Sequence, residues 1–345
     1  LDLSLKLYIV SGCFHFIRQS NIYNMEEGHI RYRKTVILFL FFIFICLVIV
    51  ISIVFNGSSF MKVPDTLLMI EELPDVSCNP DDMLREDFVK DYQSKDDFVI
   101  PSVDRLNQMN HEELSAMYHR YINNVQYLCK KKVRMGMLED GGWEVCAESK
   151  YLPPPLSSSG SNSSCLIYSV GINNDFSFDD DMVKFYRCEV HSFDPSMKQE
   201  DFKRSDLDYF YKLGLSGREF QNNLGWKMMT LQGIRKMLNH TQRIIDVLKI
   251  DIERSEWEAL PEMLQSGVLK QVRQLSIELH LHIAPPQHKD VPRAKYLQAL
   301  DILRQLYEEG FRIFWTHPNP SCIFLSRCRN LRRANCHELN FLKVS

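Results

Sequence analysis

The sequence lacks three features that would assign it to a common class of protein: a basic stripe, a C-x-x-C motif and a G-x-G-x-x-G motif. The formal net charge is -3 and the basic run Lys130–Lys132 stands alone, which argues against the positive surface that nucleic-acid binding requires. The cysteines are spread too widely for a zinc ribbon. Without the glycine-rich turn, pyrophosphate binding is not expected either. We therefore expect no nucleic-acid partner and no structural zinc.

The longest uncharged apolar run is VILFLFFIFICLVIVISIVF, residues 36–55. About 20 such residues in a helix cross the ~30 Å core of a bilayer, so the run predicts a transmembrane helix; a core helix and a cleaved signal peptide are the alternatives. Arg31, Arg33 and Lys34 precede the run, whereas Lys62 is the one base soon after it. This asymmetry predicts a single-pass type II membrane protein of the secretory pathway (Golgi or ER), with its C-terminal domain luminal or extracellular.

Composition divides the chain into segments. We expect a cytoplasmic tail (1–35), the transmembrane helix (36–55), a luminal stem (56–109), a cover helix with a GGW segment and a Pro/Ser loop (110–164), and an α/β domain (165–345). Because the chain opens on Leu1 and Met25 is a candidate start, residues 1–24 could be an artefact of the gene model. The cover helix is expected within residues 111–133, where apolar residues recur at helical spacing.

Cysteine usage fits the luminal side of a membrane. The cysteines after the predicted span are Cys78, Cys129, Cys146, Cys165, Cys188, Cys322, Cys328 and Cys336. An even set in an oxidising compartment favours disulfides, and their pairing stays open at this point. Acceptor triplets for N-glycosylation begin at Asn56, Asn162 and Asn239.

Beyond Cys165, short apolar runs alternate with stretches of helical spacing. This alternation predicts an α/β fold with a mostly parallel sheet that helices cover on both faces. The last two apolar runs, residues 311–318 and 322–327, are separated only by Asn319–Ser321. We expect them to form an antiparallel C-terminal hairpin at one edge of the sheet.

Ligands of open parallel sheets bind beyond the carboxyl ends of the strands, so the residues that follow each run are candidate site residues. Gly171 follows the first run, with Asn173 and two further polar residues behind it. Asp194 follows the second, about twenty residues later, where an acid suits the two hydroxyls of a ribose. The loop 214–217 follows the third and could cover an aromatic base. Asp251 follows the fourth. The series favours a nucleoside without phosphates.

The segment LKIDIERSEWEAL, residues 248–260, contains four acids after its apolar run. We expect Asp251 to face the cleft and Ser255 to cap the next helix, with Glu256 and Glu258 in the first helical turn, where acids suit the helix dipole. Glu253 either lines the cleft with Asp251 or simply precedes the cap. Trp257 is expected to pack the helix onto the sheet.

In SIELHLH, Glu278, His280 and His282 share one face of a strand because side chains alternate along it. With Asp251 they could bind a divalent metal. The alternative, which we expect, is histidines that hydrogen-bond at a strand end with no metal.

The segments CLIYSVGINNDFSFDDDMVKFYRCEVHSFDPSM and DVLKIDIERSEWEALPEML, with GGWEVC upstream, resemble the methyltransferase-like protein 24 family, which is similar to the FkbM group of O-methyltransferases. The resemblance spans roughly residues 110–330 and includes the N-terminal anchor. It implies a class I, Rossmann-like methyltransferase fold that binds S-adenosylmethionine. The first loop departs from the D/E-x-G-x-G-x-G of the broad class, with Tyr168 and Ser169 before Gly171 and no second glycine.

The resemblance and the strand-end series together assign roles. The expected cofactor-binding residues are Gly171, Asn173, Asp194, Pro195, Ser196, Leu215 and Ser216, the catalytic residues are Asp251 and His280, and the substrate-binding residues are Glu253 and Glu278. Asp251 or His280 would take the proton of a hydroxyl acceptor.

The expected function is O-methylation of a glycan or another hydroxyl acceptor with S-adenosylmethionine as the small-molecule donor. One alternative is a non-catalytic, membrane-anchored interaction protein that keeps the fold. A second is a Golgi glycosyltransferase, which would need a D-x-D motif at a strand end. The pairs Asp206 with Asp208 and Asp179 with Asp181 are the candidates, and both stand at the wrong place relative to their strands.

Overall fold

The structure, a computed structural model, describes residues 99–138, 141–153, 165–281, 291–326 and 331–344. All of them belong to one compact unit, Val76–Ser345. The predicted tail and membrane span, the stem up to residue 98, Asn162, Cys328 and His282 lie outside the described residues. Among the helices that are described, none has the length and apolar character needed to cross a bilayer.

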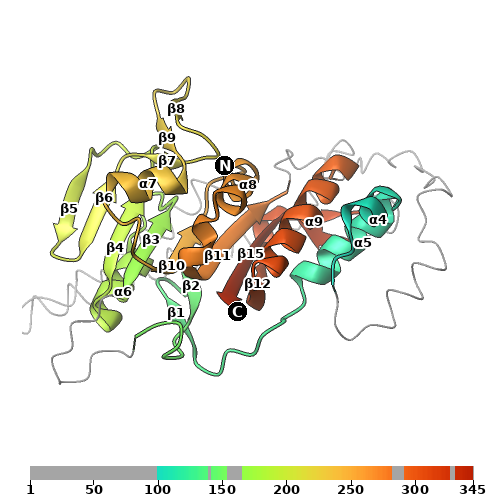
Figure 1. The fold of residues 1–345 in the computed structure, drawn as a ribbon, viewed down its shortest axis with the longest axis horizontal. Coiled ribbons are helices and arrows are strands. Elements are labelled where there is room, and N and C mark those ends of the chain that lie inside the picture. Colours follow the sequence, from blue (N-terminus) through green and yellow to red (C-terminus); the bar gives the residue numbers. More distant parts are fainter. Residues whose placement is uncertain (1–98, 139–140, 154–164, 282–290, 327–330, 345) are drawn as a thin grey trace, which may run out of the picture. The chain divides into compact units, whose positions relative to one another are not determined.

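The centre of this unit is an eight-stranded sheet in the order β12-β15-β11-β10-β3-β4-β6-β5 (Figure 1). Its strands are β3 (Leu166–Val170), β4 (Glu189–Phe193), β5 (Phe202–Ser205), β6 (Asp208–Tyr211), β10 (Ile245–Ile250), β11 (Val272–His280), β12 (Phe311–Pro318) and β15 (Cys336–Lys343). The neighbours from β11 to β6 are parallel, whereas β5 and β15 are antiparallel to the strands beside them. The predicted α/β fold with a mostly parallel sheet is confirmed.

The predicted C-terminal hairpin has the wrong partner. β12 pairs with β15, which runs between β11 and β12. The run that we expected beside β12 is β13 (Ile323–Leu325), and it pairs instead with β14 (Arg332–Ala334) after the 3-10 turn η5 (Pro320–Cys322). Pro318 and Pro320 flank the connection and have no N–H for a hairpin ladder. β15 escaped notice because its buried residues include His337, Glu338 and Asn340.

Alternate residues of β3 face two different cores, as the pleat of a strand requires. Leu166, Tyr168 and Val170 belong to the larger core, and Ile167 belongs to the smaller one. The larger core also takes residues from α4 (Val103–Asn107), α5 (His111–Ile122), α7 (Leu231–Met237), α8 (Glu256–Ser266), η4 (Val268–Gln271) and α9 (Arg293–Glu308). The smaller core takes residues from β1 (Lys132–Met135), β2 (Trp143–Cys146) and α6 (Ser177–Tyr186). Both faces of the sheet are therefore covered.

The cover helix is α5, and it is shorter than predicted. It begins with a capping box between Asn110 and Glu113 and ends at Ile122. It lies beside α9 (Figure 1), where the Tyr118 and Tyr296 rings are 5.7 Å apart. The residues beyond it turn into β1, which pairs with β2. A disulfide joins Cys129, in this connection, to Cys146 of β2.

Three disulfides join described cysteines: Cys129–Cys146, Cys165–Cys188 and Cys322–Cys336. The expectation of bridges is confirmed for these six residues. Cys165–Cys188 connects the starts of β3 and β4, whereas Cys322–Cys336 connects η5 to the start of β15. A separate three-stranded sheet consists of β7 (Gly214–Leu215), β9 (Lys227–Met229) and β8 (Phe220–Gln221).

Candidate functional site

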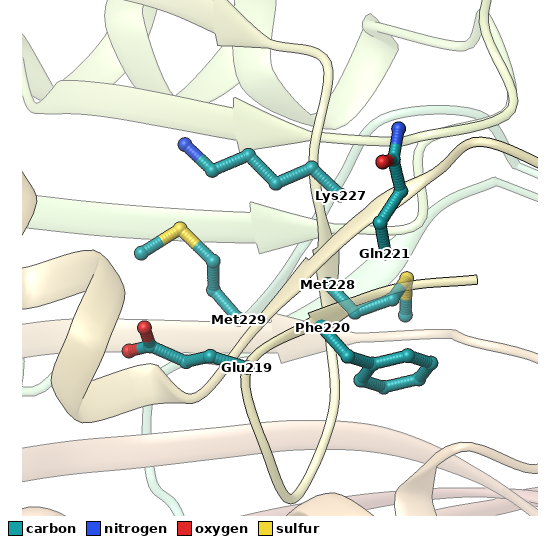
Figure 2. A pocket seen from close by; sticks show the side chains of 6 residues that line it. All are labelled: Glu219, Phe220, Gln221, Lys227, Met228 and Met229. Atoms are coloured by element: carbon teal, nitrogen blue, oxygen red, sulfur yellow. The ribbon is translucent and has the colours of Figure 1, made fainter.

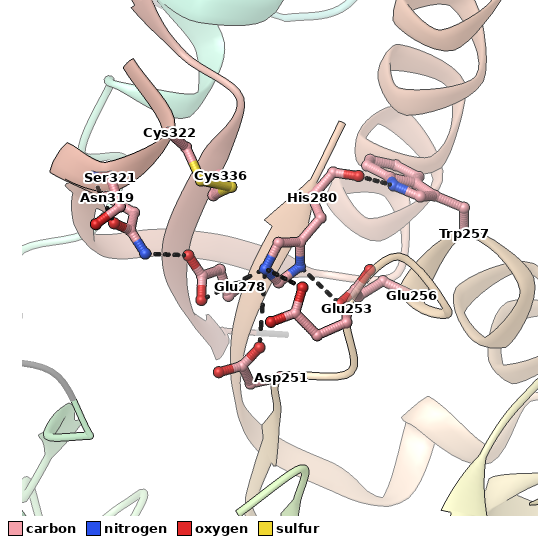
Figure 3. The surroundings of a disulfide bond; sticks show 10 residues. All are labelled: Asp251, Glu253, Glu256, Trp257, Glu278, His280, Asn319, Ser321, Cys322 and Cys336. Carbon is pink, nitrogen blue, oxygen red and sulfur yellow. Dashed lines mark hydrogen bonds and ion pairs between the residues drawn. A yellow bond between two sulfur atoms is a disulfide. The ribbon is translucent and has the colours of Figure 1, made fainter. Parts of the chain in front are cut away.

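His280 ends β11 and lies among four acidic side chains (Figure 3). β10 and β11 are parallel neighbours, with Ile250 opposite Ile277, so their carboxyl ends meet at one edge of the sheet. Asp251 and Glu253 follow β10, Glu278 and His280 end β11, and Glu256 begins α8. We call these five residues the His280 cluster. The structure thus brings together all four residues predicted to be catalytic or substrate-binding.

The two ring nitrogens of His280 have different surroundings. Nδ1 is 3.0 Å from Glu256 Oε1, and because a carboxylate can only accept, Nδ1 carries the proton of this bond. Nε2 is 3.7 Å from Glu253 Oε2, 3.7 Å from Glu278 Oε2 and 3.9 Å from Asp251 Oδ1. These three distances are too long for hydrogen bonds.

The charges of the cluster shift its proton affinities. Burial by itself lowers the pKa of His280, but the hydrogen bond and charge of Glu256, aided by Glu278, outweigh burial and raise that pKa to about 9. Burial and the charge of Glu278 raise the pKa of Asp251 to about 7. At neutral pH His280 therefore holds a proton, and Asp251 lies near its titration point. Asp251 Oδ1 is buried and has no hydrogen-bond partner among the described residues.

Glu256 lies in the first turn of α8, as predicted, and it has a second role that was not predicted. Its side chain is fully buried, and Oε1 accepts both from His280 and, at 3.1 Å, from the backbone N–H of Ile252. The Ser255 side chain makes no capping hydrogen bond, so the predicted cap is wrong. Glu256 displaces it because a buried carboxylate can satisfy a backbone donor and a histidine together. Trp257 packs the helix as predicted: it is buried and donates from Nε1 to the His280 carbonyl at 2.7 Å.

The backbone between Asp251 and α8 is strained. Glu253 and Arg254 have φ values of 50° and 86°, in the left-handed region that residues with a Cβ avoid. Each such residue costs roughly 1–3 kcal/mol and persists only where its surroundings impose it. Strain of this kind concentrates at functional sites, and here it turns the exposed Glu253 side chain back toward His280.

The predicted cofactor residues after β3 and β4 form a second group. Asp194 is buried; Oδ2 accepts from the Asn173 N–H at 2.8 Å, and Oδ1 accepts from the Ser196 N–H at 2.8 Å and the Ser196 hydroxyl at 2.6 Å. These bonds fasten the loop after β3 to the turn after β4. Gly171 connects this group to the His280 cluster, because its backbone lies directly against Asp251.

Leu215 and Ser216, also predicted to bind the cofactor, belong neither to the Asp194 group nor to the His280 cluster. Leu215 is fully buried in the larger core, and Ser216 Oγ donates to Glu258 Oε2 at 3.1 Å. Gly217 also lies against α8, since an added Cβ would come within 2.2 Å of the Glu258 carbonyl oxygen. The segment that was expected to cover a base thus packs onto the helix.

One cavity lies beside Asp194 at the end of β4, and another lies on the small sheet of β7, β9 and β8. A cavity of about 570 Å³ includes Pro195, Leu213, Trp226 and Met237 in its wall, and Pro195 directly follows Asp194. Figure 2 shows the other, about 380 Å³, whose lining comes from β8, β9 and Glu219. Trp226 was not identified from the sequence as a candidate site residue. A tryptophan directly after a glycine in a polar segment is a signal that could have indicated it.

Neither D-x-D candidate offers two free carboxylates. Asp179 is fully buried and accepts from the Ser192 hydroxyl at 2.7 Å. Asp208 is buried and pairs with Arg204. The glycosyltransferase alternative therefore finds no support at these positions.

Comparisons with known proteins agree with the resemblance. The family model described as "Methyltransferase domain" matches residues 81–342, which begins inside the expected stem. The chain is 26% identical over 244 residues to the "Probable methyltransferase-like protein 24" of Homo sapiens, covering 68% of this chain and 65% of that protein. It is 26% identical over 248 residues to the protein of the same name of Rattus norvegicus, covering 68% and 66%. Each match thus spans slightly less than two thirds of the relative's own length. No solved structure matches significantly.

Proposed function

The chain belongs to the methyltransferase domain family, whose model matches residues 81–342, and from this premise we propose that it transfers a methyl group from S-adenosylmethionine to a hydroxyl acceptor, such as a glycan hydroxyl. The observation that carries the proposal is the His280 cluster at the carboxyl ends of β10 and β11, beside the Asp194 group. In open parallel sheets this edge is where ligands bind.

The residues after β3 and β4 fit a nucleoside. Asp194 Oδ1 already accepts twice, from the Ser196 N–H and hydroxyl, whereas Oδ2 accepts once, from the Asn173 N–H, so Oδ2 can still accept from a ribose hydroxyl. The cavity beside it is lined by Pro195, Leu213, Trp226 and Met237, which could contact an aromatic base, and also by four charged residues, Glu200, Asp201, Lys212 and Lys227. Asn173, with its side chain exposed beside Asp194, is in place to contact the donor.

When bound, S-adenosylmethionine supplies an electrophilic methyl group on a sulfonium. The transfer is an in-line displacement: the acceptor oxygen bonds to the methyl carbon, the carbon–sulfur bond breaks with its electron pair going to sulfur, and the hydroxyl proton must leave. We assign that proton to Asp251, because Oδ1 is buried without a hydrogen bond and the pKa lies at about 7. His280 is already protonated and holds the carboxylates in position.

We also propose that residues 36–55 anchor the chain with its catalytic domain in the secretory lumen. The uncharged run and its basic flank support this orientation. The three disulfides among the described residues suit an oxidising compartment. Protease protection of the domain in intact microsomes tests the orientation, and digestion without detergent would contradict it.

Transfer of a labelled methyl group from S-adenosylmethionine to a panel of secretory glycans tests the reaction. Asp251→Asn should lower the rate by at least about 100-fold, as loss of a general base does. Asp206→Asn is the matched control, because the Asp206 side chain is fully exposed in the turn between β5 and β6. Equal rates for wild type and Asp251→Asn would refute the assignment of the base.

A further inference from the structure

His280 is held in the manner of a metal ligand. Histidines that bind metals usually donate their other ring N–H to a carboxylate, which fixes the tautomer and the direction of the ligating nitrogen. Glu256 supplies this carboxylate from a fully buried position, 3.0 Å from Nδ1. Nε2 is left facing Asp251, Glu253 and Glu278 (Figure 3).

The spacing of the surrounding oxygens fits a shared ion. Ligand atoms about 2.0–2.3 Å from one cation lie roughly 3.0–4.3 Å from each other. The three carboxylate oxygens lie 3.7–3.9 Å from Nε2. The ligand atoms of Asp251, Glu253 and His280 all lie within 4.8 Å of one another. The Asp251 and Glu253 contacts are too long to be hydrogen bonds and short enough to share one ion with His280, whereas Glu278 groups with His280 and Cys336 instead.

The Nε2 atom of the His280 imidazole lacks a hydrogen-bond partner among the described residues. The His280 side chain is 5% exposed, and Nε2 makes no hydrogen bond to any described residue. Four carboxylates face one histidine, and Lys249 is a further cation that acts on Asp251. Buried groups of like charge are costly unless a cation or proton compensates them.

We propose that one divalent cation of the first transition row, such as Mn²⁺, displaces the Nε2 proton of His280 and binds Nε2 together with the carboxylates of Asp251 and Glu253. One imidazole with several carboxylates is a donor set that this ion accepts. This inference reverses our expectation from the sequence that no metal is bound. The site does not need His282, which lies outside the described residues.

The remaining contacts of Glu278 support this arrangement. Glu278 Oε1 accepts from Asn319 Nδ2 at 2.9 Å, which leaves Oε2 directed at His280. The Asn319 N–H donates to the Cys336 carbonyl at 3.1 Å, and the Cys322–Cys336 disulfide holds the two segments together. Asn319 therefore positions a carboxylate beside the ligand His280 without touching the ion.

Other groups of possible ligands in the described part of the chain are less suitable. Glu189, His191 and His240 converge, but Arg243 donates to Glu189 at 2.8 Å and lies 3.2 Å from His240 Nε2, so a positive group already occupies that place. The groups that contain cysteine use cysteines bonded in disulfides. The His280 cluster is the one that lacks such a competitor.

Binding of the ion goes beyond the proposed function and can be measured without a methyl donor. Its role rests on that function: where the ion is bound, Asp251 serves as its ligand, and the cation instead of the free carboxylate would favour loss of the acceptor proton. S-adenosylhomocysteine binding, measured separately, keeps failure of the ion site distinguishable from failure of the methyltransferase assignment.

Titration of Mn²⁺ into the chelator-treated full chain, followed by the electron paramagnetic resonance of the free ion, tests the proposal. We expect one Mn²⁺ per chain, with imidazole ¹⁴N coupling that His280→Gln abolishes. Asp251→Asn should weaken binding at least 100-fold. Glu253→Gln should weaken it about tenfold with the fold unchanged, because the Glu253 side chain is 74% exposed.

Glu189→Gln is the matched control, since it removes a carboxylate from a histidine group that Arg243 already neutralises. It should bind Mn²⁺ as wild type does. A folded wild type that binds no Mn²⁺ at millimolar concentration would overturn the proposal. So would equal affinity in the wild type, Asp251→Asn and Glu253→Gln.

Discussion

Gly171 lies against Asp251 so closely that a Cβ at residue 171 would come within 1.6 Å of the Asp251 carbonyl oxygen. Gly171 also has a φ of 75°, which only glycine adopts without strain. The backbone N–H of Asp251 donates to Val170 at 3.0 Å, so the ends of β3 and β10 are locked together. This contact sets the distance between the Asp194 group and the His280 cluster.

Gly171→Ala should disrupt this junction. We expect it to lower the free energy of unfolding by more than about 3 kcal/mol, because strain and a backbone clash act together. Gly267→Ala is the matched control: its φ is 71°, but the nearest atom to an added Cβ is a Lys270 carbon at 3.8 Å. Chemical denaturation of both variants measures the difference. Equal losses would show that the Asp251 contact is unimportant.

Asp179 should make the stability depend on pH. Burial raises its pKa to about 7, aided by Asp208 and opposed by Lys249 and the Ser192 hydrogen bond. The unfolded value is near 3.8, so between these values the folded state binds the extra proton and stability falls as pH rises.

We therefore expect wild type to lose about 3 kcal/mol between pH 5 and pH 8 relative to Asp179→Asn. Urea unfolding at the two pH values measures this difference. Asp206→Asn, which changes a fully exposed carboxylate, should keep the wild-type dependence. A constant difference between wild type and Asp179→Asn would contradict the burial of an ionisable group at this position.

Asn319→Ala should weaken Mn²⁺ binding about tenfold, because Asn319 orients the Glu278 carboxylate beside His280 and loss of such an outer partner typically costs 10–100-fold in affinity. The variant leaves His280, Asp251 and Glu253 in place and removes the 2.9 Å hydrogen bond to Glu278, together with the bond that Asn319 Oδ1 accepts from the Ser321 N–H. Asn222→Ala, in the turn before Trp226, removes similar local bonds away from the ion and should bind normally. Unchanged affinity in Asn319→Ala would separate Asn319 from the site.

The sequence was sufficient for the parallel part of the sheet and for the strand-end acids, because apolar runs and the residues after them follow directly from strand geometry. It was insufficient for β15, whose buried Glu338 and Asn340 break the apolar pattern. It placed Glu256 correctly in the first turn of α8 but did not indicate its bond to His280, since that bond depends on where β11 lies. Asn319 is joined to Glu278 only by tertiary contacts.

The central claim is that the ends of β3 and β4 bind a methyl donor beside the His280 cluster. Calorimetric titration of S-adenosylhomocysteine into the full chain, with Asp194→Ala and the control Asp206→Ala beside it, tests this claim most directly. We expect binding by wild type and Asp206→Ala, and loss of binding in a folded Asp194→Ala. A folded wild type that does not bind, or an Asp194→Ala that binds equally well, would contradict the account.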